Sequence, residues 1–203
     1  MNQRSPYSWA NYLLGANIVV WGLAGAWLAV TEEGLSTVRV CVTVLNLLVG
    51  LLILLRKTPL QRLRLHSKAW WLPALLCTGA IFKYSQPFSD WGMLPVGLFV
   101  CGTVMALWSL GTLGGSFTIR PAAVPLVQRG PYRLVRHPAY TGELLMVLAC
   151  VVARFDVWLL CLLAGLLLFQ VLRILEEERV MAAGGMYGSY KETTRWRLLP
   201  WVW

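Results

Sequence analysis

Long apolar runs separated by short polar turns dominate the chain. Each is long enough, or nearly so, to cross a bilayer core of about 30 Å at about 1.5 Å per residue. A further apolar tract, residues 143–175, is too long for one ordinary span and is interrupted at residues 153–157, which predicts a helical hairpin with its tip there. The four preceding spans are expected at about residues 12–30, 38–55, 69–84 and 91–113.

This pattern predicts an all-α integral membrane protein with about six transmembrane crossings, the last two forming the hairpin. With 58% hydrophobic and only 13% charged residues among 203, the chain is too apolar for an ordinary soluble domain of its size. Further spans follow the first one directly, so the first is expected to be a span and not a cleaved signal. No repeat or low-complexity linker divides the chain, which predicts a single domain, with N-terminal spans in residues 1–90 and a chemically distinctive core in 91–203.

Basic residues gather in the turns on one side of the predicted bundle. The loop of residues 56–68 carries five Lys and Arg residues, whereas the turn of residues 31–37 carries Glu32 and Glu33 and no base. By the positive-inside rule the basic loop is cytoplasmic, which predicts that both termini are cytoplasmic too. The net charge of +9 then reflects basic loops at the membrane surface. We expect the lipid bilayer as a partner and no binding of nucleic acid. His66, in the basic loop, is expected to be solvated.

The cysteines all fall inside apolar tracts. None has the spacing of a zinc site or of a disulfide framework, and we expect no metal site. They are expected to be small buried apolar residues. They are Cys41, Cys77, Cys101, Cys150 and Cys161.

One polar stretch stands out between the fourth span and the hairpin. Residues 130–142 read G-P-Y-R-L-V-R-H-P-A-Y-T-G, and polar groups this close to hydrocarbon need water, protein or a ligand to satisfy them. The other end of the hairpin carries Arg173 followed by three glutamates, Glu176 to Glu178. Arg173 and Glu177 share a helix face at the i,i+4 spacing, with Glu178 turned away by roughly 100°. Because both segments flank one hairpin, we expect them to meet in one site.

Each of these residues also has an ordinary structural explanation. Histidine can cap a backbone carbonyl, arginine and tyrosine can anchor at the membrane interface, and glycine and proline form turns. An Arg–Glu pair at a helix end is common and contributes only a few tenths of a kcal/mol. The concentration of these residues in one short run favours a functional site, but the residues alone leave both explanations open. The residues concerned are Gly130, Tyr132, Arg136, His137, Pro138, Tyr140, Arg173 and Glu177.

The run G-P-Y-R-x-V-R-H-P-x-Y-x-G, followed after one hairpin by R-I-x-x-E-E, then Y-x-x-Y and a late proline, resembles the isoprenylcysteine carboxyl methyltransferase family and its relatives, the membrane phospholipid N-methyltransferases. The resemblance covers about residues 113–200. It implies a membrane enzyme that uses S-adenosyl-L-methionine and closes its cofactor pocket with a cytoplasmic C-terminal segment. No G-x-G-x-x-G fingerprint of a dinucleotide-binding fold is present.

The resemblance also implies roles for individual residues. The catalytic candidates are Arg173 and Arg136, which would orient an anionic acceptor, and Glu177, which would accept a proton from an amine acceptor. The family's Phe-Gly pair is replaced here by residues 183–186. This difference is expected to affect how the pocket closes and which substrate it takes, more than which cofactor it binds. The implied cofactor-binding residues are Gly130, Tyr132, His137, Pro138, Tyr140, Gly142, Glu177 and Glu178.

Several reactions remain open from the sequence. A carboxylate acceptor needs only a cation to orient it, which favours carboxyl O-methylation of a lipid-like or isoprenylated acceptor that reaches the site from within the membrane. An amine acceptor, as in a phospholipid N-methyltransferase, needs a base in addition. A nicotinamide-dependent membrane reductase and a non-enzymatic transporter or regulator are also compatible with residues of this kind. The transporter is weakened because the spans are almost free of ionisable residues.

Overall fold

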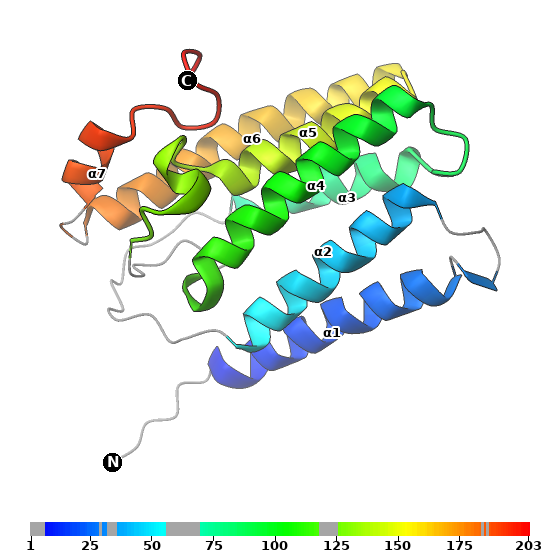
Figure 1. Ribbon diagram of the computed structural model, residues 1–203, viewed down its shortest axis with the longest axis horizontal. Coiled ribbons are helices and arrows are strands. Elements are labelled where there is room, and N and C mark those ends of the chain that lie inside the picture. Colours follow the sequence, from blue (N-terminus) through cyan, green and yellow to red (C-terminus); the bar gives the residue numbers. More distant parts are fainter. Residues whose placement is uncertain are drawn as a thin grey trace.

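The computed structural model describes residues 7–28, 30–31, 36–55, 70–117, 126–183, 185 and 187–203. In this part of the chain all regular structure is helical, in agreement with the predicted fold class. Six long helices lie side by side, and the short α7 and the C-terminus lie beyond them (Figure 1). The elements are α1 (Tyr7–Leu28), α2 (Thr37–Leu54), α3 (Trp71–Tyr84), α4 (Met93–Leu113), η2 (Gly114–Ser116), η3 (Gly130–Arg133), α5 (Pro138–Ala153), α6 (Val157–Ala182) and α7 (Tyr187–Thr193).

Local signals determine where two of these helices begin. α2 follows Ser36, whose hydroxyl accepts a hydrogen bond from a backbone N–H of the first turn at 3.3 Å. α6 follows Asp156, whose carboxylate does the same at 2.7 Å. Both are N-cap contacts that satisfy an otherwise unpaired helix N–H. The predicted hairpin tip is confirmed, because α5 ends at Ala153 and α6 begins at Val157.

The hairpin helices extend further toward the polar residues than the apolar pattern predicted. α5 begins at Pro138 and not at Glu143, because proline at the first helical position loses no hydrogen bond and already has a helical φ. The end of the polar stretch is therefore the first turn of α5. α6 continues past residue 175 to Ala182, so the acidic residues are helical, as expected.

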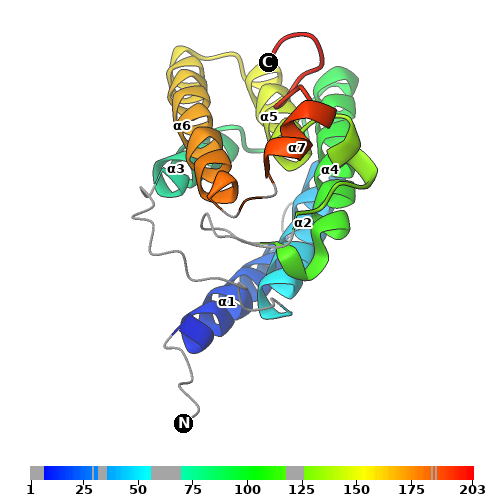
Figure 2. The ribbon, with the colours of Figure 1, turned by 90° about the vertical axis from the view of Figure 1, so that its left-hand side faces the viewer.

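α4 lies between α2 and α5. It packs against α2 on one side and α5 on the other, while α1 pairs with α2 and α3 lies along α6 (Figure 2). α4 and α5 approach most closely where Gly102 faces Gly142: a Cβ at Gly142 would lie 2.6 Å from the Gly102 carbonyl oxygen. Small residues permit this backbone approach, which is how helices gain packing energy in lipid.

Apolar side chains lie on the outside of the bundle as well as in its core. Phe99, Val147 and Leu166 are fully buried, whereas Trp27 and Trp158 are 70% and 75% exposed. Such an outer surface suits contact with lipid, which is as apolar as the core. The expectation of buried cysteines is wrong for Cys101 and Cys161, which are exposed, for the same reason. Cys150 is buried, and Cys41 and Cys77 are intermediate.

Among the described residues, three helices are long and apolar enough to cross a membrane: Thr37–Leu54, Met93–Ser116 and Val157–Ala182. The apolar helices Tyr12–Trp27 and Pro138–Ala153 are shorter. Six crossings and the cytoplasmic position of both termini therefore remain predictions. The residues on which the predicted orientation depends, Glu32, Glu33 and the loop with His66, lie outside the described residues.

Candidate active site

The polar stretch begins at a glycine turn that lies against the end of α4, and it is held against α7. Gly130 adopts a left-handed φ of 58° and lies close to the last turn of α4, where a Cβ would meet the Thr112 Oγ1 at 3.0 Å. Only glycine adopts this conformation without strain. Tyr132 is buried, and its carbonyl oxygen accepts a hydrogen bond from the Tyr190 hydroxyl at 2.7 Å. The stretch is thereby fixed between α4 and α7.

The C-terminal segment, residues 194–203, lies along the other side of the polar stretch. The backbone N–H groups of Arg136 and His137 donate to the carbonyls of Trp196 and Arg197 at 2.8 and 2.9 Å. The Thr141 hydroxyl on α5 donates to the Leu198 carbonyl at 2.9 Å. These backbone contacts join segments about 60 residues apart and position the side chains between them.

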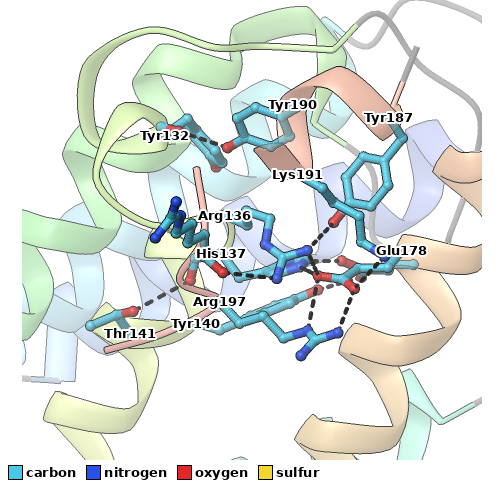
Figure 3. Close-up of polar contacts among 12 residues, drawn as sticks. Tyr132, Arg136, His137, Tyr140, Thr141, Glu178, Tyr187, Tyr190, Lys191 and Arg197 are labelled. Carbon is cyan, nitrogen blue, oxygen red and sulfur yellow. Dashed lines mark hydrogen bonds and ion pairs between the residues drawn. The ribbon is translucent and has the colours of Figure 1, made fainter. Parts of the chain in front are cut away.

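Glu178 is the centre of the first of two ionic groups (Figure 3). Its carboxylate lies 2.9 Å from Arg136 Nη1 and accepts two hydrogen bonds from Arg197, at 3.1 and 3.0 Å. His137 Nε2 lies 3.5 Å away and Lys191 Nζ 4.0 Å away. The side chains of Glu178 and Arg136 are only 5% and 6% exposed. A carboxylate this deeply buried is stable as an anion only with such partners.

Glu177 is the centre of the second group. The predicted i,i+4 pair is confirmed, because Arg173 Nε donates to Glu177 Oε1 at 3.3 Å. The Tyr140 hydroxyl donates to the same oxygen, and the Arg173 guanidinium lies 4.7 Å from the centre of the Tyr140 ring. His137 stacks on that ring and places Nδ1 3.8 Å from Glu177 Oε2. His137 therefore lies between the two glutamates and faces both.

α7 completes the site with two buried tyrosines. The Tyr187 hydroxyl accepts a hydrogen bond from Arg136 Nη1 at 3.4 Å. Burial raises the pKa of Tyr190 to about 12. Burial, and then the Glu178 carboxylate, raise the pKa of Tyr187 as well. Both phenols therefore stay neutral at physiological pH and cannot repel the carboxylates.

Not every residue predicted for the site meets these two groups. Gly130 contacts the end of α4, and Tyr132 links the polar stretch to α7 through its carbonyl. Pro138 is buried at the start of α5, and Gly142 faces α4. These residues shape the backbone around the site, and a cofactor contact for them stays a prediction. The predicted residues that the fold does bring together are Arg136, His137, Tyr140, Arg173, Glu177 and Glu178.

Sequence reasoning did not find the partners that the C-terminal region contributes to Glu178. In the sequence, Arg197 and Lys191 are simply two of several basic residues near the C-terminus. A signal was nevertheless present: three consecutive glutamates at the end of an apolar helix need several cations, and the residues that follow supply them. The choice among those cations depends on the path of the chain after α6.

The chemistry of the site suits a ligand that carries both hydrogen-bond donors and acceptors. Among the described residues, Arg136 Nε and His137 Nε2 are buried and make no hydrogen bond. A buried donor without an acceptor costs about 1–3 kcal/mol, so a ligand that accepts from Arg136 Nε would be favoured, whereas His137 Nε2 already lies 3.5 Å from Glu178 Oε1. A cleft of about 590 Å³ lies between the end of α4, η2 and residues 126–129. The glutamates do not line it.

The profile of the isoprenylcysteine carboxyl methyltransferase (ICMT) family matches residues 95–183. The matched region includes α4 from its third residue, the polar stretch, the hairpin and both glutamates of the site. It begins before the expected residue 113 and ends before α7 and the C-terminal segment. No curated protein matches the chain.

Proposed function

We propose that the chain is a membrane methyltransferase of the isoprenylcysteine carboxyl methyltransferase family, whose profile matches residues 95–183. It would transfer a methyl group from S-adenosyl-L-methionine to the carboxylate of a lipid-like or isoprenylated acceptor. The observation that carries the proposal is the pair of ionic groups around Glu177 and Glu178. Both glutamates lie near the end of the apolar helix α6, within the matched region. The match to a methyltransferase family over residues 95–183 favours methyl transfer over nicotinamide-dependent reduction.

The residues of the site fit the cofactor. Carboxylates suit its hydroxyl and ammonium groups, and the buried Arg136 Nε and His137 Nε2 suit its carboxylate or ring acceptors. Glu177, Glu178, His137 and Arg136 would hold it. When bound, S-adenosyl-L-methionine supplies an electrophilic methyl group on a sulfonium.

Orientation is the main contribution that the side chains make to methyl transfer onto a carboxylate. Such an acceptor is already anionic and needs no base, only a cation held at the correct angle. Arg173 is held by Glu177 and by the face of the Tyr140 ring. Arg136 is held by Glu178. Both guanidinium groups are therefore oriented before an acceptor arrives, which lowers the entropy cost of binding it.

Amine N-methylation is the second candidate, and one observation favours it. The Glu177 side chain is 18% exposed and its Oε2 lies 3.8 Å from His137 Nδ1, too far for a hydrogen bond. That oxygen could accept a proton from an ammonium group before transfer. The acceptor could then be an aminophospholipid.

Calorimetric titration of the detergent-solubilised protein with S-adenosylhomocysteine tests the cofactor. We expect saturable binding by the wild type and by Glu192→Gln, a control that removes an exposed carboxylate on α7. Glu178→Gln should weaken binding at least about tenfold, since a hydrogen bond to a charged group contributes about 1.5–3 kcal/mol. Failure of folded wild-type protein to bind, or binding of a reduced nicotinamide instead, would contradict the proposal.

Transfer of a radiolabelled methyl group tests the acceptor. The protein is offered an isoprenylated thioether carboxylic acid in one reaction and phosphatidylethanolamine vesicles in another. A methyl ester releases its label as methanol in mild alkali, whereas a methylamine does not. Alkali-labile label on the carboxylic acid supports O-methylation, and stable label on the phospholipid would establish the second candidate instead.

A further inference from the structure

A separate polar cluster, made of Thr78, Glu143 and Gln170, lies inside the bundle and does not include the two glutamates of the site. The carboxylate of Glu143 on α5 accepts a hydrogen bond from the Thr78 hydroxyl of α3 at 2.8 Å. Its other oxygen accepts from the Gln170 amide of α6 at 3.0 Å. Three helices that otherwise contact one another through apolar residues thus meet at one carboxylate.

One atom of this group has no partner. Gln170 is 1% exposed, and its Oε1 makes no hydrogen bond within the described part of the chain. The amide orientation is determined by Glu143, which can only accept and therefore faces the Gln170 NH₂ group. A buried amide oxygen without a donor is costly, so it marks a place where a donor from another molecule would be favoured.

The group lies next to the reactive residues. Glu143 follows Tyr140 by three positions on α5, and Gln170 precedes Arg173 by three positions on α6. Residues three apart lie on the same helix face, about 4.5 Å apart along the axis. Tyr140 and Arg173 contact each other, so the cluster of Thr78, Glu143 and Gln170 is about one turn deeper along both helices. Glu143 is only partly buried, whereas Gln170 Oε1 is covered, so a ligand would reach that oxygen from the Glu143 side of the group.

We propose that Glu143 and Gln170 form a subsite that accepts a hydrogen bond from an N–H group of the methyl acceptor, one helical turn from the group that is methylated. The inference rests on the proposed function. A lipid-like acceptor reaches this depth from the apolar side of the bundle, whereas a polar, soluble cofactor approaches from its polar end. Gln170 Oε1 then distinguishes methyl acceptors that carry an N–H near the reactive group from those that do not. A methyl acceptor without the N–H binds less tightly, because it leaves this buried oxygen without a hydrogen bond.

Equilibrium binding of three isoprenylated thioether carboxylic acids to the solubilised full-length chain, without cofactor, tests the subsite. One probe carries an N-acyl amide, one carries a free amine, and one has no nitrogen. We expect the wild type to bind the better of the two nitrogen probes about tenfold more tightly than the nitrogen-free probe, as one buried hydrogen bond permits. The preferred nitrogen probe identifies whether an amide or an amine is the source of the N–H.

Two variants separate the subsite from general packing. Gln170→Leu removes the unpartnered oxygen and should bind all three probes equally, and Gln170→Met serves if the leucine variant does not fold. Thr78→Val removes a hydrogen bond to Glu143 but leaves Gln170 Oε1 in place, so it should lower stability and keep the preference. In methyl transfer, Gln170→Leu should raise KM for the nitrogen probe with little change in kcat.

Equal binding of all probes by the wild type, or a preference that survives in Gln170→Leu, would overturn the subsite. Failure of every probe to bind would overturn it as well. S-adenosylhomocysteine binding, measured on the same sample, distinguishes that outcome from failure of the proposed function. A chain that binds the cofactor product and methylates acceptors with and without nitrogen equally well keeps its function and lacks the subsite.

Discussion

Replacing Gly142 by alanine should destabilise the protein through the contact between α4 and α5. A Cβ at this position would lie 2.6 Å from the Gly102 carbonyl oxygen and 2.7 Å from the Ala106 backbone N. Both are backbone atoms of a packed helix and cannot turn aside. The reciprocal position behaves alike, because a Cβ at Gly102 would lie 2.7 Å from the Gly142 carbonyl oxygen. The helices must therefore separate to admit one methyl group.

The size of the effect follows from two opposing terms. Overpacking costs about 1–3 kcal/mol, and replacing a helical glycine by alanine returns up to about 1 kcal/mol through helix propensity. Because the clashing atoms are backbone, we take the upper part of that cost, about 2–3 kcal/mol. The net loss is then about 1–2 kcal/mol, which for a chain of this length corresponds to a fall in melting temperature of roughly 2–8 °C. Gly102→Ala should cause a loss of similar size.

Thermal unfolding in one detergent, followed by tryptophan fluorescence, measures these changes. The matched controls are Gly97→Ala and Gly111→Ala on α4, where a Cβ would meet nothing within 4 Å. They should be neutral or stabilising. If Gly142→Ala melts no lower than the controls, the close contact is not what holds α4 against α5. If Gly142→Ala weakens S-adenosylhomocysteine binding while Gly102→Ala does not, the predicted cofactor contact of Gly142 is supported.

Three further predictions concern the site and the hairpin tip. Glu178→Gln and Arg197→Gln should be non-additive in melting experiments, with a coupling of about 1–3 kcal/mol, because the two side chains share two hydrogen bonds; additive losses would refute the pairing. Burial raises the pKa of Tyr190 to about 12, above about 10 in an unfolded chain, so its contribution to stability is complete below about pH 10 and is lost as pH rises through about 12. Tyr190→Phe should remove one tyrosinate absorbance step near pH 12, and an unchanged titration would contradict this. A hydrogen bond from Arg154 lowers the pKa of Asp90. Any contribution of this pair to stability is therefore present above about pH 4 and is lost as the pH falls. Because the pair is exposed, Asp90→Asn should barely change the melting temperature at neutral pH, and a large fall would contradict this.

Much of the fold follows from local patterns in the sequence. The break around Phe155 in a long apolar tract predicted the hairpin tip, because a charged pair cannot continue a lipid-facing helix. The i,i+4 spacing predicted the contact between Arg173 and Glu177, since both lie on one face of a single helix. Proximity of the polar stretch to the end of α6 also followed, because the two segments flank one hairpin.

Other features depend on segments that are distant in sequence. Helical spacing predicted that Glu178 points away from Arg173. That Glu178 faces Arg197 follows only from the position of the C-terminal segment beside it. The resemblance implies a cofactor contact for Gly142, which stays a prediction, and the sequence did not reveal that Gly142 packs against Gly102. The orientation of a helix about its axis decides such contacts, and in a chain that is apolar on both its inner and outer faces the hydrophobic pattern does not reveal that orientation.

The sequence by itself thus determined the helical class, the hairpin and the chemical character of the site, because hydrophobic length and helical spacing act over a few residues. Tertiary structure alone decided which cation meets which carboxylate, which glycine serves packing, and that Thr78, Glu143 and Gln170 meet inside the bundle. These contacts join separate helices, and their partners are selected by how the helices pack and not by any local pattern.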